Sequence, residues 1–397
     1  MKILVVCQHY WPEPFPLTDI CEALIKKGHE VHIITDVPNY PMGYIYDGYK
    51  NGKNRKQTHN GVRISRTFTI GRRNNLIFRF LNYFSFAISS TLFALRLKED
   101  YDVVFTNQTS PILMVNAAMA YAKKHKKKTV LYCMDLWPAS LAAGGVGQGS
   151  PIYKVFHRIS DYLYKKADRI LITSSMFREY FKKEFGIEDS KISYLPQYAN
   201  AGFEAANSTE NTKKDTVDLM FAGNIGAAQS IDTILGAAKI LRDKEFLRWH
   251  LVGDGSELEN LKALAKKENL SNVIFHGRHP IEKMPGFYSL ADAMLVTLTK
   301  DPFISLTLPA KVQSYMAAGK PVIASADGEI PVVINDSKCG FSAPAEDATA
   351  LASAVMEFIN YEDKKSLADA ARRYYKENFT QELFIEKLES ELINHCI

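Results

Sequence analysis

The sequence predicts an α/β protein made of two doubly wound domains that face a central cleft, each a parallel sheet between layers of helices. Three observations support this prediction. Short apolar runs alternate with stretches long enough for crossover helices. One polar stretch interrupts the alternation, which then starts again. With 397 residues, the chain is long enough for two domains of ordinary size, each with its own core.

The first domain is expected over residues 1–200 and the second over residues 201–397, with a linker at 199–216. In the first domain, strands are predicted at 2–7, 30–35, 62–68, 102–107, 129–134, 169–174 and 192–196. In the second, they are predicted at 217–223, 249–255, 273–277, 293–298, 321–326 and 339–344. We expect the last helix of the chain to pack back on the first domain.

Several classes of protein are excluded by composition. The five cysteines are scattered and form no C-x-x-C pair, so neither a disulfide framework nor a zinc site is indicated, and a reducing cytoplasm is expected. The first apolar run ends after six residues, too short for the core of a signal peptide. No stretch reaches the roughly 20 apolar residues of a membrane span, and the nearest, 80–95, contains Asn82 and several serines.

Residues 50–98 combine a basic block with an aromatic, apolar helix. Residues 50–79 contain nine Lys and Arg and no acidic residue, within a chain of net charge +5. This pattern predicts contact with an anionic surface, and we expect the inner face of the cell membrane. Two alternatives stay open: a solvated loop next to a core helix, or binding to nucleic acid, for which no recognised DNA-binding motif occurs.

The stretch TLPAKVQSYMAAGKPVIAS, 307–325, predicts a short helix followed by a buried strand. Pro309 suits the helix start, Gly319 its end, and Pro321 prevents continuation. Lys311 then lies in the first turn, where the helix dipole disfavours a cation by about 0.3–1 kcal/mol. An anion held by both the lysine and the helix start would reverse that cost.

The second domain carries small or polar residues just beyond several predicted strands, where open parallel sheets bind ligands. They are Gly223, Asn224, Gly253, Asp254, Arg278, Lys311, Gly328 and Glu329. Two cations and several helix starts suit a diphosphate, and Glu329 suits sugar or ribose hydroxyls. Neither G-x-G-x-x-G after the first strand nor a P-loop occurs. A nucleotide sugar therefore fits better than NAD or ATP.

These motifs resemble glycosyltransferase family 4, which has the GT-B fold. The matching stretches are GNIGAAQSIDTIL at 223–235, LVGDGSELENL at 251–261, VIFHGRHPIEKMPGFYSLADAMLV at 273–296 and LPAKVQSYMAAGKPVIASADGE at 308–329. HYWPEP at 9–14, VPNYPMG at 37–43 and MDLWP at 134–138 are similar to bacterial O-antigen and capsule transferases that include N-acetyl-L-fucosamine transferases. The resemblance covers nearly the whole chain.

The resemblance implies a donor site in the second domain. Gly223, Asn224 and Lys311 would face the diphosphate, the turn with Arg278 and His279 the base, and the loop ending at Thr307 and Leu308 the sugar. This chain departs from the family pattern twice. Leu306 and Ser314 stand where many members carry a pair of glutamates, so Gln313 or Ser314 would replace the ribose-binding carboxylate. Gln229 stands where a basic residue is common, which leaves more of the phosphate charge to Lys311 and Arg278.

The resemblance implies an acceptor site in the first domain. Asp135, His9 and Glu13 are the candidate catalytic residues, and each follows a predicted strand. Asp135 would orient or deprotonate the acceptor hydroxyl, or else cap the next helix. Acceptor contacts are assigned to Tyr10, Trp11, Asn107 and Trp137, with the two tryptophans either stacking on sugars or packing in the core. No required metal and no cofactor are expected.

The implied activity is retaining transfer of a sugar from a nucleotide diphosphate donor. We expect a UDP-sugar, with N-acetylfucosamine as the sugar, and a lipid-diphosphate-linked saccharide as acceptor, in surface polysaccharide synthesis. Such an enzyme would be cytoplasmic and bound peripherally to the inner membrane face. The alternatives are a nucleotide-sugar epimerase of the same fold and a non-catalytic bilobal binding protein.

Overall fold

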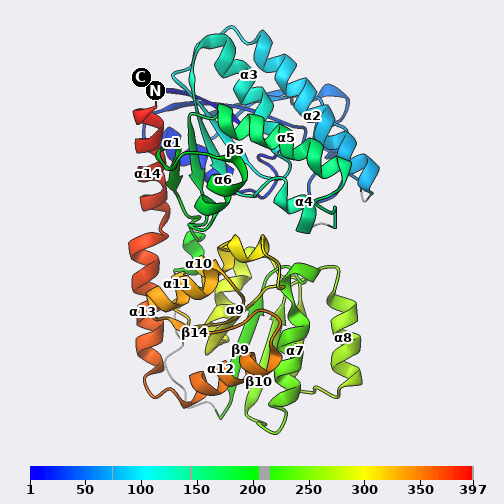
Figure 1. The fold of residues 1–397 in the computed structure, drawn as a ribbon, viewed down its shortest axis with the longest axis vertical. Helices are drawn as coiled ribbons and strands as arrows, with labels where there is room; N and C mark the ends of the chain where they lie inside the picture. Colours follow the sequence, from blue (N-terminus) through cyan, green and yellow to red (C-terminus); the bar gives the residue numbers. More distant parts are fainter. Residues whose placement is uncertain (74, 144, 205–214, 396–397) are drawn as a thin grey trace. The chain divides into compact units, whose positions relative to one another are not determined.

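The computed structural model describes residues 1–73, 75–143, 145–204 and 215–395, and the chain divides into two compact units (Figure 1). Unit 1 comprises Met1–Thr173, Phe177–Leu195 and Ile385–Ile397, and unit 2 comprises Ser174–Met176 and Pro196–Phe384. Each unit is built on a largely or wholly parallel sheet with helices packed against it. The predicted fold class is confirmed.

Unit 1 contains an eight-stranded sheet. In spatial order the strands are β3 (Lys56–His59), β4 (Val62–Arg66), β2 (Glu30–Thr35), β1 (Lys2–Val6), β5 (Val103–Gln108), β6 (Lys128–Cys133), β7 (Arg169–Ile172) and β8 (Ile192–Tyr194). All neighbours pair in parallel except β3, which is antiparallel to β4. All seven predicted strands are confirmed. The eighth, β3, was missed because its sequence KQTH lies in the basic block and has no apolar run.

Helices α2 (Leu76–Arg96) and α3 (Val115–His125) pack over one face of this sheet. Leu4 of β1 and Val104 of β5 share a buried cluster with Ala94 of α2 and Tyr121 of α3. Helix α1 (Leu17–Lys26) packs on β2 and β4. The remaining helices of the unit's main segments are α4 (Ala139–Ala143), α5 (Pro151–Lys166) and α6 (Phe177–Phe185). Burial of the apolar strands between such layers supplies the driving force for this half of the fold.

Unit 2 contains a six-stranded, wholly parallel sheet. Its order is β11 (Val273–Gly277), β10 (Leu247–Val252), β9 (Val217–Ala222), β12 (Ala293–Thr297), β13 (Val322–Ser325) and β14 (Gly340–Ala343), and all six predicted strands are confirmed. One core cluster includes residues of α7 (Ile231–Ile240), α8 (Leu258–Lys267) and α12 (Ala348–Asn360). The other includes residues of α9 (Met284–Leu290), α10 (Ala310–Ala317), α11 (Glu329–Ser337) and α13 (Lys364–Asn378).

The chain passes between the units at 173/174, 176/177, 195/196 and 384/385. Of the predicted linker, residues 205–214 lie outside the described residues. The last helix, α14 (Gln381–Asn394), begins in unit 2 and ends in unit 1. In unit 1, Glu391 of α14 pairs with Arg169 of β7 at 2.8 Å, and Glu389 pairs with Lys27 at 2.9 Å.

The carboxyl ends of β9 and β10 approach each other so closely that only glycine fits. Gly223 has φ +148° and Gly253 has φ +145°. A Cβ atom on Gly253 would lie 1.8 Å from the carbonyl oxygen of Gly223. Any larger side chain would force these two strand ends apart.

We therefore expect Gly253→Ala to destabilise unit 2 strongly. The clash and the unfavourable φ together should lower the free energy of unfolding by roughly 2–5 kcal/mol. Gly286→Ala is the matched control, because a Cβ there meets nothing within 4 Å and φ is not positive. Urea denaturation of both variants measures the difference, and equal midpoints would contradict the close approach.

Candidate functional site

Lys311 is the centre of a small polar site in unit 2. It lies in the first turn of α10, as predicted, directly after Ala310. Its Nζ donates a hydrogen bond to Oε1 of Gln229 and lies 4.0 Å from the centroid of the Phe221 ring. A Cβ atom on Gly223 would lie 3.2 Å from the same Nζ, so any side chain there would crowd the ammonium group. The structure thus brings Lys311, Gln229 and Gly223 together from three separate elements.

The surroundings of Lys311 favour an anion. Burial lowers the pKa of Lys311 to about 7. Among the described residues, no carboxylate oxygen lies within the 4.0 Å of an ion pair to its Nζ. No side chain caps the start of α10, so backbone N–H groups there remain available. A phosphate group would be attracted by both the ammonium and the helix start.

Glu329 does not offer the free carboxylate that its predicted role requires. It is 2% exposed, at the start of α11. Oε1 accepts from the Ser175 backbone N–H at 3.0 Å, and Oε2 accepts from the Ser175 hydroxyl at 2.9 Å and the Met176 backbone N–H at 3.1 Å. All three donors lie in the 174–176 segment, which belongs to unit 2. In this structure Glu329 anchors that segment, because both of its oxygens are already occupied.

The other predicted donor residues differ in how free their side chains are. The Ser314 hydroxyl donates to the Ala310 carbonyl within its own helix, and the Thr307 hydroxyl donates to the Ile304 carbonyl. Leu308 is buried, and Asp254 accepts from the Gly255 backbone N–H at 2.8 Å. These side chains stabilise local structure, which leaves their backbone groups as possible ligand contacts.

Three further donor candidates lie at turns or inside the core. Gln313 is fully buried, and neither atom of its amide has a hydrogen-bond partner in the described part of the chain. The Asn224 side chain lies over Gly226, because a Cβ atom added to Gly226 would be 2.6 Å from Nδ2 of Asn224. Gly328 has φ +76°, and a Cβ there would lie 2.1 Å from the Ser305 carbonyl oxygen. Gly328 therefore allows the 305–308 loop to pass close to the start of α11.

Arg278 and His279 follow β11, two strands from β9 in the sheet. Arg278 is exposed, whereas His279 donates from Nε2 to the His276 carbonyl at 3.1 Å. A hydrogen-bonded chain lies beside this turn and was not predicted. His250 Nε2 is 2.9 Å from Asp218 Oδ1, and its Nδ1 is 2.8 Å from His276 Nε2. Burial, with the neighbouring histidines, lowers the pKa of His276.

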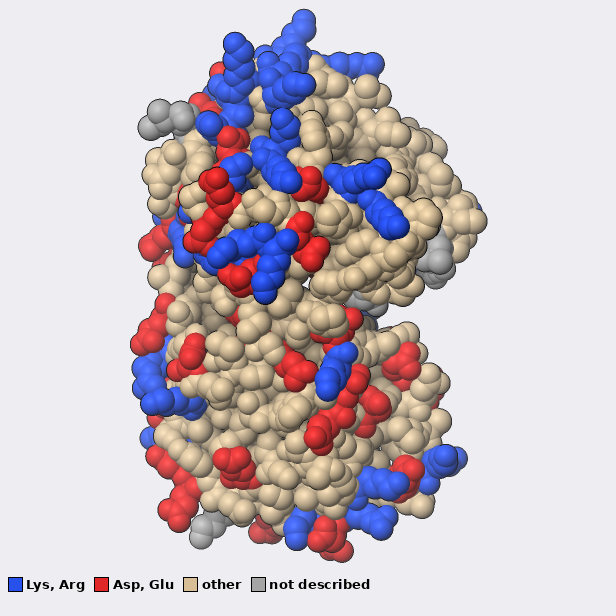
Figure 2. All heavy atoms as spheres, viewed as in Figure 1, with Lys and Arg blue, Asp and Glu red and all other residues tan. Residues whose placement is uncertain are grey.

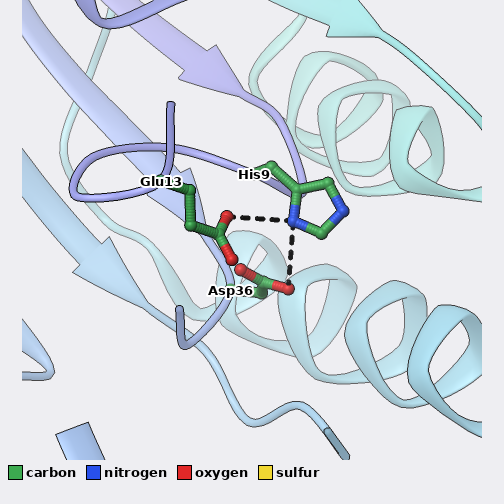
Figure 3. A group of neighbouring side chains, drawn as sticks. All are labelled: His9, Glu13 and Asp36. Carbon is green, nitrogen blue, oxygen red and sulfur yellow. Dashed lines mark hydrogen bonds and ion pairs between the residues drawn. The ribbon is translucent and has the colours of Figure 1, made fainter. Parts of the chain in front are cut away.

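A second cluster lies in unit 1, after β1 and β2, and consists of His9, Glu13 and Asp36 (Figure 3). His9 Nδ1 is 3.0 Å from Glu13 Oε2 and 3.8 Å from Asp36 Oδ2. All three residues are buried. His9 and Glu13 were predicted site residues, but Asp36 was not. Its only sequence signal is its position one residue after β2, at the same sheet edge as the residues that follow β1.

This cluster is also the one place among the described residues where three potential metal ligands lie together, with ligand atoms within 4.8 Å of one another. A histidine nitrogen and two carboxylate oxygens suit zinc or another divalent transition metal. Glu13 Oε1 already accepts two backbone N–H groups, from Asn39 and Tyr40, both at 2.6 Å. The absence of a required metal stays a prediction.

Asp135 lies after β6 and bonds to a serine. Its Oδ2 accepts from the Ser110 hydroxyl at 3.0 Å, and the same Ser110 oxygen accepts from Trp137 Nε1 at 2.7 Å. Burial raises the pKa of Asp135. No bond from this carboxylate to the start of α4 occurs among the described residues, so the geometry does not support the helix-cap alternative.

The predicted acceptor contacts of unit 1 are mostly packed side chains. Tyr10 is 0% exposed, and Trp137 is 3% exposed with its ring against Phe156 at 5.3 Å. Trp137 is therefore packed in the core, which is one of the two roles predicted for it, and the Tyr10 ring is not exposed to an acceptor. Trp11 stacks on His59 with ring centroids 3.9 Å apart. Asn107 is 3% exposed, and its Oδ1 has no hydrogen-bond partner in the described chain.

Two family models match the two halves of the chain. Residues 17–198 match the model described as Glycosyltransferase Family 4, and residues 203–378 match the model described as Glycosyl transferases group 1. The second match includes the Lys311 site, whereas the first begins after His9 and Glu13 and includes only Asp36 of that cluster.

Curated relatives have related names. A probable glycosyltransferase WbjE of Pseudomonas aeruginosa is 26% identical over 72% of this chain and 73% of that protein. A putative colanic acid biosynthesis glycosyl transferase WcaI of Escherichia coli K12 is 24% identical over 82% of this chain and 84% of that protein.

Solved structures share the fold. Sucrose-phosphate synthase from Thermosynechococcus elongatus superposes with a TM-score of 0.76 at 17% identity, covering 98% of this chain and 97% of that one. Anabaena HepE, solved in complex with UDP, gives a TM-score of 0.73 at 14% identity, covering 99% of this chain and 100% of that one.

We expect Lys311→Met to stabilise the protein, most strongly at low pH. The pKa of Lys311 is lower in the folded state than in the unfolded state, so folding is penalised wherever the side chain must be charged. That penalty is complete below about pH 7 and is relieved as pH rises toward the unfolded pKa. Because the side chain is only partly buried, we expect a gain of about 1–2 kcal/mol at pH 6.

Urea denaturation at pH 6 and pH 10 measures this difference, with Lys300→Met, an exposed position, as the matched control. The gain should shrink at pH 10. If Lys311→Met lost the same stability at pH 6 and at pH 10, the lysine side chain would contribute only packing and its charge would carry no folding penalty.

Proposed function

We propose that this chain, a glycosyltransferase of the GT-B fold whose halves match family 4 and group 1, transfers a sugar from a UDP-sugar to a lipid-diphosphate-linked saccharide with retention of configuration. We propose N-acetylfucosamine as the sugar and surface polysaccharide synthesis as the setting. The relatives support this proposal by their names, WbjE and the colanic acid transferase WcaI. The UDP complex of a protein with the same fold supports the donor class.

The observation that carries the proposal is the arrangement of Lys311. A partly buried ammonium group with no carboxylate partner in the described chain is a costly feature unless an anion binds to it. Gly223 keeps the space beside Nζ open, and Gln229 holds the ammonium group in place. The diphosphate of a nucleotide sugar has the charge and size for this position.

The same arrangement suits the chemical step. As the bond between the sugar and the diphosphate breaks, negative charge grows on the leaving phosphate oxygen. Fixed donors that already point to this oxygen stabilise the transition state without reorganising. Lys311 and the uncapped N–H groups of α10 are such donors. No metal is required by this scheme.

We further propose that unit 1 binds an anionic membrane surface through α2. Its large exposed apolar residues follow one another at intervals of three and four, which places them in one stripe along the helix. They are Ile77, Leu81, Phe84, Ile88, Leu92 and Leu95. The opposite side of α2 is buried, so the alternative of a core helix describes only the inner side of α2. By length and composition alone, Ile77–Arg96 would also pass as a membrane span, with a third of its apolar window buried.

Charge supports the same surface. Arg73 and Arg79 lie at one end of α2, and Arg96 and Lys98 at the other, all exposed. Lys and Arg gather over the upper part of unit 1 in Figure 2, the part in which Figure 1 draws α2 and α3. Basic residues around an apolar stripe are typical of helices that lie in the interface of an anionic bilayer.

The central test of this function is transfer itself. The protein is incubated with a panel of UDP-, GDP- and TDP-sugars and a synthetic lipid-diphosphate saccharide as acceptor. We expect one UDP-sugar to give a product, which is detected by its mass. NMR of this product should show the same anomeric configuration as in the donor. Lys311→Met should weaken UDP binding by ~1–3 kcal/mol. Wild-type affinity should also fall as pH rises from 7 to 9, because binding requires the charged form of Lys311.

Lys311→Arg is the control for that pH dependence, because arginine stays charged over the whole range. Calorimetry that finds equal UDP affinity in wild type and Lys311→Met removes Lys311 from the donor site. Turnover of a UDP-sugar without any acceptor would instead indicate an epimerase. Binding without turnover of any donor would indicate a non-catalytic binding protein.

For the membrane surface, we expect wild type to sediment with vesicles of phosphatidylglycerol and phosphatidylethanolamine but not with phosphatidylcholine alone. Ile88→Asp on the stripe should reduce binding at least ~10-fold, since burial of one isoleucine contributes about 1.5–3 kcal/mol. Ile240→Asp is the matched control, because Ile240 is similarly exposed but lies on α7. Dimerisation through α2 without vesicle binding would contradict this assignment.

A further inference from the structure

Two carboxyl groups, those of Glu13 and Asp36, lie beside one imidazole, that of His9, at the carboxyl edge of the unit 1 sheet. All three side chains are buried. Figure 3 shows both carboxyl groups on the Nδ1 side of the His9 ring, whereas Nε2 is directed away from them. Burial of two neighbouring carboxylates is costly unless a cation compensates for their charge. The cluster therefore holds either protons or a metal ion.

The protein around the cluster does not supply that cation. Arg66 of β4 donates to the backbone carbonyls of Asp36 and Trp11. Among the described residues, no Lys or Arg nitrogen lies within 4.0 Å of a Glu13 or Asp36 carboxylate oxygen. Asp36 Oδ1 and the neighbouring Gln8 Oε1 are buried acceptors without a hydrogen-bond partner in the same part of the chain. A ligand that accepts electron pairs from oxygen would satisfy these atoms.

A second layer of hydrogen bonds fixes both carboxyl groups. Glu13 Oε1 accepts the backbone N–H groups of Asn39 and Tyr40, both at 2.6 Å, which leaves Oε2 facing His9. The side chain of the same Asn39 donates from Nδ2 to Asp36 Oδ2 at 2.9 Å. Outer contacts of this kind orient the ligands of metal sites and raise their affinity.

The spacing of the three side chains suits a small metal ion. His9 Nδ1 is 3.0 Å from Glu13 Oε2 and 3.8 Å from Asp36 Oδ2. Ligand atoms bound at 2.0–2.1 Å in a tetrahedron are about 3.3–3.4 Å apart, a value between these two distances. Stacking on Phe15, with ring centroids 5.0 Å apart, holds the His9 ring in place. One imidazole nitrogen with two carboxylate oxygens favours zinc over magnesium, which prefers oxygen ligands alone.

We propose that His9 Nδ1, Glu13 Oε2 and Asp36 bind one divalent transition-metal ion, zinc by its ligand set, which joins the loop after β1 to the loop after β2. The ion replaces the hydrogen bond between His9 and Glu13. It is bound by a neutral imidazole and two carboxylates, so any proton that the metal-free cluster holds is released on binding. Because the site is buried, the ion is structural and stabilises unit 1. It goes beyond the proposed function, whose transfer scheme at Lys311 does not use it.

Zinc binding is measured on the full chain without nucleotide or acceptor. The protein is freed of metal with a chelator, mixed with an excess of Zn²⁺ and desalted, and its zinc content is determined by mass spectrometry. We expect about one zinc ion per wild-type chain. The midpoint of thermal unfolding should rise with Zn²⁺ and not with Mg²⁺, because an ion that binds only the folded state stabilises it.

The decisive variant is Asp36→Asn, which keeps the shape of the side chain and removes a charged ligand. It should weaken zinc binding at least ~10-fold. Asp100→Asn changes an exposed carboxylate of the same unit and should bind zinc like wild type. If Asp36→Asn does not fold, Co²⁺ provides the test in wild type. We expect the intense visible absorption of four-coordinate Co²⁺, which should disappear when Zn²⁺ is added.

Equal zinc content in wild type and Asp36→Asn overturns the proposal, as does a wild-type chain that retains no zinc. Stabilisation by Mg²⁺ but not by Zn²⁺ also overturns it, because the site would then prefer oxygen ligands alone. These measurements use no UDP-sugar, so a failure of zinc binding leaves the proposed function standing. A failure of sugar transfer, in turn, leaves the zinc site standing.

Discussion

The placement of one cation, Lys311, is the constraint on which the interpretation of unit 2 depends. Its ammonium group is held by the amide of Gln229 and the ring of Phe221, and its burial lowers the pKa to about 7. Packing alone does not explain such an arrangement, since an apolar side chain of the same length would fill the space without desolvating a charge. The proposed function does explain it, because a protein that binds and then releases a diphosphate would benefit from a cation whose full charge develops only with the ligand.

The backbone of unit 2 is built to bring that cation to the sheet edge. Glycine at 253 permits the close approach of the carboxyl ends of β9 and β10, and the missing side chain of Gly223 leaves room beside the Nζ of Lys311. The parallel sheet places the ends of all six strands at one edge. Gly223 and Gly253 therefore contribute both to the stability of unit 2, through the packing of β9 against β10, and to the geometry of the proposed ligand site.

Local sequence predicts local structure well in this chain. The apolar runs correctly predicted the strands of both sheets apart from β3. The order Pro309, Lys311, Gly319 correctly predicted helix α10 with its lysine in the first turn. Strand β3 was missed because edge pairing with β4, rather than an apolar run, determines it. The sequence could suggest Lys311 as an anion ligand because a helix start is a local feature.

Contacts between distant segments were not predictable in the same way. No motif in the sequence pointed to Asp36 as a site residue. Only the pairing of β1 with β2 places Asp36 beside His9. The hydrogen-bonded chain from Asp218 through His250 to His276 forms because β9, β10 and β11 are neighbours in the sheet. Glu329 looked free in sequence and is occupied by donors more than 150 residues away. Burial of Trp137 likewise depends on α5, which supplies Phe156.

Unit 1 joins its outer surface to its polar cluster through side-chain amides. Asn82 lies on the buried side of α2, opposite the exposed apolar stripe. Its Oδ1 accepts from Gln8 Nε2 at 2.7 Å, and its Nδ2 donates to Asn39 Oδ1 at 3.2 Å. Asn39 in turn donates to Asp36 at 2.9 Å. Asn82 is a fully buried polar residue of α2, and this network gives the reason. Hydrogen bonds connect the helix with the exposed apolar stripe to the residues around His9.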